Sequence, residues 1–479
     1  MICYTLFYEN YDEMFSMSDA ILEIGGRKSK ADSEGCAYRK KNVSSFMTLP
    51  DSVSFIDEIP LIGNLSIKRF RLGNGLLVAI VVDTTAPIFT YQTWFKTGSA
   101  DEAPGRQGLA HLFEHMMFRK TSRRPMGEFD RLVNSNGGTG LNAYTSRDQT
   151  VYYFTFPNDK LGIAADLEAD RMNNLIIDRE MFETEKGAVL TEKNRGLDEP
   201  MRYLWEELYK LAYTSHTYKY STIGETDTIK NFSVVDAETF YRNYYAPGNA
   251  LIIVVGDLNP EAVMRTIAGQ YGNLPGREPK KRILPAEPKQ DDERFAELAH
   301  RKATQPMLAK AWHIPPITHN DVPALVILGK LLSSGKSALL NERLLYASKV
   351  TEVFADAYMS RDMGTFEFFA QLASDVPFEE VERVFATTVS ELADGPISGD
   401  QMQVVKNATK REFYQSITSP ASLAQKLGDG FIYADDLAYQ IRAIERIDHV
   451  TPADVGRVIE TYLHRAPSTT VRLTQNGHG

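Results

Sequence analysis

Residues 111–115 of this 479-residue chain constrain its fold and chemistry most, because they read His-Leu-Phe-Glu-His. Apolar residues flank the motif and no proline interrupts it, which predicts a helix here. On a helix, His111 and His115 are four residues apart and project from one face, so both imidazoles can reach one metal ion. Glu114 lies beside them and could take a proton from a water activated by that metal. A catalytic zinc site usually has three protein ligands, so the chain must supply another.

A second acidic segment supplies the candidate for that ligand. Residues 178–193 have a helical pattern and carry Glu185 and Glu192, which are seven residues or about two turns apart. Both carboxylates therefore lie on roughly the same face of the expected helix. One could bind the metal while the other orients a ligand histidine, which is a common arrangement at zinc sites.

The motif and its spacing resemble the pitrilysin/insulinase peptidases, the inverzincins, in which the usual zincin order is inverted. That family separates its second histidine from its third ligand by 76 residues, as this chain separates His115 from Glu192. Its supporting glutamate precedes the third ligand by seven residues, as Glu185 does here. The resemblance implies one Zn²⁺ per chain, held by His111, His115 and Glu192. It also implies Glu114 as the general base and Glu185 as the residue that orients a ligand histidine.

Two further segments resemble the same family. Residues 138–153 look like its substrate-binding edge strand, with Asn142 and Ala143 at the positions next to the scissile bond. A peptide would add to that edge as an extra strand, held mainly by main-chain hydrogen bonds. Residues 244–257 look like the end of its first domain. The family implies an α+β fold of two homologous domains, each a mainly antiparallel sheet packed with helices, which together form half of a clamshell.

Pattern and composition divide the chain into four predicted segments. Residues 1–60 are interpreted as an N-terminal extension of unknown role, and residues 61–274 as the zinc-bearing peptidase domain. Residues 275–292 are rich in proline and charge, cannot pack as core, and are interpreted as a linker. Residues 293–479 are interpreted as a second homologous domain without a metal site. Within the first domain, one strand is expected over Asn142–Phe156.

A weak internal repeat supports a duplication. A helical segment, an Ala-Pro pair and an apolar strand follow Asp236, and the same succession follows Pro452, at an offset of about 216 residues. The second copy contains no His-x-x-Glu-His motif, so only the first half is expected to hold metal.

Bulk properties restrict the class of protein. The net charge of −10 argues against nucleic acid as the main partner. No apolar run approaches the ~20 residues of a membrane helix. The two cysteines, Cys3 and Cys36, make neither a disulfide framework nor a structural zinc site. The first residues lack the pattern of a signal peptide, so the cytoplasm is the default compartment and the periplasm is left open.

The predicted activity is zinc-dependent endopeptidase cleavage of short or unfolded peptides enclosed in a chamber. The family's second half usually contributes an Arg and a Tyr, seven apart, that grip the substrate. The alignment places Leu345 and Glu352 there, while Arg343 and Tyr346 have the wrong spacing. The resemblance therefore implies a zinc-bearing subunit paired with a homologous zinc-less subunit that carries the Arg/Tyr pair, with a homodimer as runner-up. A presequence-processing subunit and a non-catalytic scaffold subunit are the alternatives.

Overall fold

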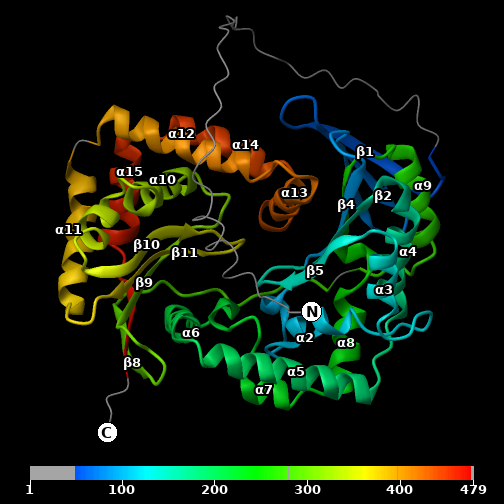
Figure 1. The fold of residues 1–479 in the computed structure, drawn as a ribbon, viewed down its shortest axis with the longest axis horizontal. Coiled ribbons are helices and arrows are strands. Elements are labelled where there is room, and N and C mark those ends of the chain that lie inside the picture. The colour runs from blue at the N-terminus through cyan, green and yellow to red at the C-terminus, as the bar shows by residue number, and fades with distance from the viewer. Residues whose placement is uncertain (1–48, 279, 396, 476–479) are drawn as a thin grey trace, which may run out of the picture.

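The computed structural model describes residues 49–278, 280–395 and 397–475. The fold is built on two β-sheets, one of seven strands and one of five, each flanked by helices (Figure 1). Most of the predicted N-terminal extension lies outside the described residues. Within the described part of the chain, no helix is both long enough and apolar enough to span a bilayer.

The first sheet is formed by the first half of the chain. Its strands are β1 (Val53–Pro60), β2 (Ser66–Leu72), β3 (Leu77–Val82), β4 (Ile88–Phe95), β5 (Thr139–Thr145), β6 (Thr150–Pro157) and β7 (Ala250–Gly256). They lie in the order β1-β2-β3-β7-β4-β6-β5, and every neighbouring pair is antiparallel except β3 and β7. Strand β7 is buried along its whole length, as its uninterrupted apolar sequence requires. The sheet begins with β1, which lies inside the segment 1–60 that the sequence assigned to an extension.

The single strand expected over Asn142–Phe156 is instead two antiparallel strands, β5 and β6, joined by a tight turn. In that turn the Ser146 N–H donates to the Gln149 carbonyl at 2.8 Å, and the Asp148 N–H donates to the Ser146 hydroxyl at 3.3 Å. Serine and aspartate favour turns because their short polar side chains offer the backbone local hydrogen bonds. The expectation of one strand was wrong for this reason. Strand β5 is the last strand on its side of the sheet.

The second sheet repeats the arrangement of the first. Its strands are β8 (Arg294–His300), β9 (Met307–Ile314), β10 (Val350–Tyr358), β11 (Gly364–Leu372) and β12 (Thr469–Gln475). Their order, β8-β12-β9-β11-β10, corresponds strand for strand to β3-β7-β4-β6-β5. In the first sheet, β7 runs parallel to β3 and antiparallel to β4. In the second sheet, β12 runs parallel to β8 and antiparallel to β9 in the same way. The prediction of two homologous, mainly antiparallel α+β domains is therefore confirmed.

The helices that precede the two final strands are also equivalent. Helix α8 (Val234–Tyr244) begins with a capping box of Ser233 and Asp236, and α15 (Pro452–Ile459) begins with one of Thr451 and Asp454. Each box satisfies two backbone N–H groups that the helix start leaves without partners. The repeat seen in the sequence therefore marks the same helix twice. The caps align Asp236 with Asp454 rather than with Pro452, two residues from the predicted register.

The remaining helices cover the sheets and form an apolar core in each domain. In the first half they are α2 (Leu109–Met116), α3 (Glu128–Ser135), α4 (Leu161–Asn174), α5 (Arg179–Leu197), α6 (Pro200–Ala212), α7 (Thr226–Lys230) and α9 (Pro260–Tyr271). In the second half they are α10 (Val322–Ser333), α11 (Phe378–Asp394), α12 (Gly399–Gln415), α13 (Pro420–Ala434) and α14 (Tyr439–Arg446).

Each domain donates one helix to the sheet of the other (Figure 1). Helix α13, from the second half, packs on β4 and β7 of the first sheet, where Leu427 joins the buried cluster that contains Trp94 and Ile253. Helix α6, from the first half, packs on β9 and β12 of the second sheet, where Leu204 and Leu208 are fully buried. The exchange covers an apolar face of each sheet with a helix from the other domain.

We expect Gly428→Ala to destabilise the protein, although alanine favours helices by up to ~1 kcal/mol over glycine. Gly428 lies where α13 meets β4, and a Cβ added there would overlap the indole ring of Trp94. Overpacking of this kind costs about 1–3 kcal/mol, so the free energy of unfolding should fall. Denaturant unfolding monitored by tryptophan fluorescence measures it. Gly269→Ala on α9 is the control, because its Cβ would meet no atom within 4 Å; equal effects of the two would contradict the close packing.

Candidate metal centre

Helix α2, which carries the motif, has a firmly fixed start. Gly108 caps it in the left-handed region, with φ +101°, and a Cβ there would collide with the Ile223 carbonyl, so this position requires glycine. The Glu102 carboxylate accepts the N–H of Gly108 at 2.9 Å and that of Ala110 at 2.7 Å. These bonds occupy backbone donors that a helix start leaves without partners. The first turn of α2 is therefore held in place just before the first candidate ligand.

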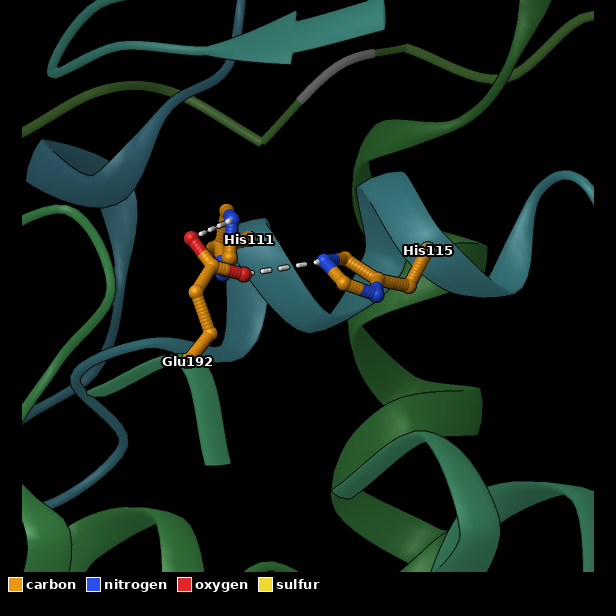
Figure 2. A group of neighbouring side chains, drawn as sticks. All are labelled: His111, His115 and Glu192. Carbon is orange, nitrogen blue, oxygen red and sulfur yellow. Dashed lines mark ion pairs between the residues drawn. The ribbon is translucent and has the colours of Figure 1, made fainter. Parts of the chain in front are cut away.

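Three side chains from two helices converge on one point (Figure 2). His111 and His115 project from α2 and Glu192 projects from α5, which packs directly on α2. His111 Nε2 lies 3.7 Å from Glu192 Oε1, and His115 Nε2 lies 3.6 Å from Glu192 Oε2. The three ligand atoms all lie within 4.8 Å of one another. Among the described residues, this is the only such group of His, Cys, Asp or Glu side chains.

These separations suit a shared metal ion better than direct hydrogen bonds. Zinc binds imidazole nitrogen and carboxylate oxygen at about 2.0–2.2 Å, so two ligand atoms of a tetrahedral site lie about 3.4 Å apart. The distances of 3.6 and 3.7 Å are close to that value, and they exceed the ~2.7–3.2 Å of an N–H···O hydrogen bond. Burial also lowers the pKa of His111, which favours the neutral imidazole that a metal binds. The residues present therefore fit zinc.

Glu185 lies behind His115 and is held by an arginine that the sequence analysis missed. Glu185 Oε2 is 3.7 Å from His115 Nδ1, the ring nitrogen that faces away from Glu192. Arg119 approaches both carboxylate oxygens, with Nε 2.7 Å from Oε1 and an NH2 hydrogen bond of 2.9 Å to Oε2. Burial alone would raise the pKa of Glu185, but His115 and Arg119 lower it below its ordinary value. Helical spacing from His115 could not have identified Arg119, because α2 ends at Met116, three residues before it.

We expect Glu185→Gln to weaken zinc binding without removing it. The neutral amide would hold the His115 ring less firmly, and the loss of such an outer partner typically reduces metal affinity by about 10–100-fold. Competition with a chromophoric chelator measures the dissociation constant. Arg119→Ala should shift it in the same direction, because the carboxylate would lose its two contacts. Arg131→Ala, at an exposed side chain on α3, is the control; unchanged affinity in both site variants would rule out this support.

Glu114, the candidate base, is buried on α2. In the sequence it lies between the two candidate histidine ligands. Its negative charge contributes, after burial, to the raised pKa of Tyr245. The side chain of Glu192 is 21% exposed, so solvent reaches part of this candidate ligand. A metal site with an accessible side next to an unligated carboxylate can support hydrolysis, because catalytic zinc sites keep one position open.

The candidate substrate residues lie on β5, and α2 packs against that strand. Ala143 is buried, and the Asn142 carboxamide oxygen accepts the Ala143 N–H at 2.9 Å. On the inner side, Asn142 pairs with Tyr153 and Ala143 pairs with Tyr152 of β6. The outer side of β5 has no neighbouring strand among the described residues. The structure therefore places β5, the strand that carries Asn142 and Ala143, beside the motif helix and at a sheet edge, where the substrate role of these residues stays a prediction.

Within the described part of the second half, Arg343, which lies near the positions expected to carry the Arg/Tyr pair, is not free. Arg343 is 3.0 Å from the Thr388 hydroxyl and forms an ion pair of 2.6 Å with Glu391, so α11 of its own domain holds it. Tyr346 is 58% exposed. Glu352 is half-buried on β10, and burial raises its pKa. None of these residues replaces the missing Arg/Tyr pair at the predicted spacing.

Comparison with known proteins decides the family. Residues 77–226 match Insulinase (Peptidase family M16), and residues 231–409 match the Peptidase M16 inactive domain. The chain belongs to peptidase family M16. The predicted resemblance is confirmed, and all the candidate ligands and the candidate base lie within the first matched range. The second M16 match agrees with a second domain that carries no His-x-x-Glu-His motif.

Relatives in family M16 include both proteases and processing subunits. Zinc protease PqqE of Helicobacter pylori is 28% identical over 411 residues, which cover 85% of this chain and 92% of that protein. The mitochondrial-processing peptidase subunit beta of Blastocladiella emersonii is 22% identical, covering 89% of this chain and 91% of that one. The crystal structure of a protease from Helicobacter pylori superposes with a TM-score of 0.81 at 28% identity, covering 85% of this chain and 99% of that one. The half-clamshell architecture predicted from the sequence is that of these M16 neighbours.

Proposed function

We propose that this chain is a zinc-dependent endopeptidase that cleaves short or unfolded peptides. The observation that carries the proposal is the convergence of His111, His115 and Glu192, with ligand atoms within 4.8 Å of one another and a buried glutamate next to them in the sequence. Membership of family M16 and the zinc proteases among the relatives support it.

Four residues of the chain take part directly in the proposed reaction. Zinc, when held by His111, His115 and Glu192, supplies Lewis-acid polarisation of the scissile carbonyl and a lowered pKa for the attacking water. Glu114 accepts the proton of that water as it attacks and delivers it to the leaving amine. Arg119 and Glu185 keep the His115 ring in one orientation, so that its Nε2 stays directed at the metal position.

The substrate is proposed to bind as an additional strand beside β5. Main-chain groups at Asn142 and Ala143 would pair with the peptide, which gives affinity with little dependence on sequence. Such pairing needs an extended segment, so folded proteins are excluded as substrates and flexible peptides are favoured. The neighbouring helix α2 would then lie alongside the bound peptide near its scissile bond.

A homologous zinc-less subunit is proposed as the partner, with a homodimer as the runner-up. The basis is the absence of an Arg/Tyr pair at the predicted spacing in the second half, where Arg343 is held by Glu391. Relatives named as the beta subunit of a processing peptidase support a two-subunit enzyme over a homodimer. Presequence processing is the second candidate function on the same ground.

Zinc content and hydrolysis of an unstructured fluorogenic peptide test the proposed function. Both are measured for the purified chain alone and after mixing with the product of a neighbouring homologous gene. Bound zinc with hydrolysis only in the mixture supports a catalytic subunit that needs a partner. Hydrolysis by the chain alone supports the homodimer. A chain without zinc, or with zinc and no hydrolysis of any peptide in either sample, would contradict the endopeptidase proposal and favour the scaffold alternative.

A further inference from the structure

Arg202, near the start of α6, rests against the side of α5 that faces the metal position. An ideal Cβ at Gly196 would lie 2.5–2.7 Å from three atoms of the Arg202 guanidinium, so that group sits on the Gly196 backbone. Gly196 follows Glu192 by four residues, one turn along the same helical face. Glu185 lies on this face as well, two turns before Glu192. The guanidinium is therefore placed about one turn beyond the carboxylate ligand and on its side of the helix.

The charge of this guanidinium acts on the candidate ligands. Burial and closer partners have larger effects on the pKa values of His111 and Glu192. Arg202 also helps to lower both pKa values. Gly196 costs α5 up to ~1 kcal/mol relative to alanine in a helix interior. In exchange, it leaves the space that the Arg202 guanidinium occupies. Gly196 carries this cost and makes room for the Arg202 guanidinium beside the candidate metal site. This arrangement indicates a role for the guanidinium.

Arg202 has most of its hydrogen-bonding capacity left over. Its one ion pair among the described residues is with Glu206, at 3.7 Å from Nε to Oε1, too long for a hydrogen bond. Glu206 is already engaged, because Lys193 Nζ lies 2.7 Å from Oε2 and the Ser221 hydroxyl donates to Oε1 at 3.1 Å. The Arg202 side chain is 22% exposed, so solvent and ligands can reach it. A guanidinium carries five N–H donors in a planar fork.

We propose that Arg202 binds a carboxylate of the peptide substrate and thereby determines specificity; this inference rests on the proposed peptidase function. A guanidinium stays charged at every working pH and matches a carboxylate with two parallel hydrogen bonds. Its guanidinium lies against Gly196 of α5, which puts that contact about one helical turn from the candidate ligand Glu192. The carboxylate can come from an acidic side chain near the scissile bond or from the C-terminus of the peptide, and the peptides chosen below separate these sources.

The test measures binding rather than turnover. One unstructured fluorescent peptide is prepared with glutamate or glutamine at each position in turn, and with a free carboxylate or an amide at its C-terminus. Affinities are measured by fluorescence anisotropy for the full chain carrying Glu114→Gln, so that bound peptide is not cleaved. We expect the carboxylate form to bind about tenfold more tightly than its neutral counterpart at one position, the size of a charge-assisted hydrogen bond.

Two further variants on this background locate the preference. Arg202→Gln should abolish it. Gly196→Ala should reduce it, because the new Cβ displaces the guanidinium while alanine keeps α5 helical. Arg179→Gln, an exposed arginine in the first turn of the same helix, is the control and should retain it. A preference at an internal glutamate identifies a side-chain carboxylate, and one at the terminus identifies the C-terminal carboxylate.

Three results would overturn the inference. The first is equal affinity for charged and neutral peptides before Arg202 is changed. The second is a preference for the carboxylate form that survives Arg202→Gln. The third is loss of zinc on Arg202→Gln, which would mean that Arg202 supports the metal ligands. Failure of the proposed function looks different. A chain that prefers carboxylate peptides through Arg202 but hydrolyses none would keep the inference and lose the peptidase proposal.

Discussion

Replacing Glu114 with glutamine is expected to leave zinc bound while kcat falls by about 10²–10⁴-fold, the usual contribution of a general base. Glutamine keeps the shape of the side chain but cannot accept the proton of the attacking water. None of the three candidate ligands changes, so the metal content should stay at one zinc per chain. Atomic absorption on the purified variant and steady-state hydrolysis of a fluorogenic peptide measure the two quantities.

A matched control for this variant is Glu128→Gln on α3, which makes the same change at a partly exposed glutamate of another helix. It should retain both zinc and activity. Residual activity near that of the unchanged chain in Glu114→Gln would remove Glu114 from the role of base. Loss of zinc in the same variant would instead place its carboxylate among the metal ligands.

Replacing Glu192 with glutamine is expected to have the larger effect on the metal. The amide would be a neutral and weaker ligand opposite His111 Nε2 and His115 Nε2, which now face the two carboxylate oxygens. The loss in zinc affinity should exceed the ~10–100-fold that follows removal of an outer-shell partner. Hydrolysis should fall to background at the zinc concentrations that are sufficient for activity of the unchanged chain. Chelator competition and peptide hydrolysis during zinc titration measure both.

The comparison variant is Glu180→Gln, in the first turn of the same helix and exposed to solvent. It removes one negative charge from α5 without touching the metal position. If Glu192→Gln binds zinc as tightly as Glu180→Gln does, the third ligand lies elsewhere and the spacing argument fails. If both variants lose zinc, the effect is one of helix stability, which thermal unfolding of the metal-free proteins would reveal.

The candidate metal site was predictable from the sequence because its candidate ligands are related by local periodicity and one fixed separation. The four-residue spacing of His111 and His115 determines that they share a helical face, and two turns relate Glu185 to Glu192 in the same way. The structure brings the two faces together as expected. Arg119 was missed, since a single arginine after the motif carries no spacing signal until its glutamate partner is placed.

The exchange of α6 and α13 could not be predicted, because periodicity identifies an apolar helical face but not the sheet that covers it. Leu427 could have packed on either sheet, and only the three-dimensional arrangement places it against Trp94. The boundary between β5 and β6 was missed for a more local reason. Apolar and aromatic residues flank the Ser146–Gln149 turn on both sides, so the strand pattern continues through it.

The position of α13 determines the order in which the nascent protein can complete its two cores. The Gln92 side chain donates to the Ala421 carbonyl at 3.0 Å, a contact across 329 residues of chain. At ~5–20 residues per second, the ribosome needs roughly 10–30 s to pass from the end of β7 to α13. During that interval the apolar face around Trp94 and Ile253 lacks the α13 residues that bury it, and transient exposure of this kind is what chaperones protect. The half of the molecule that carries the candidate metal ligands is thus synthesised first and finishes folding only when the second half has been made.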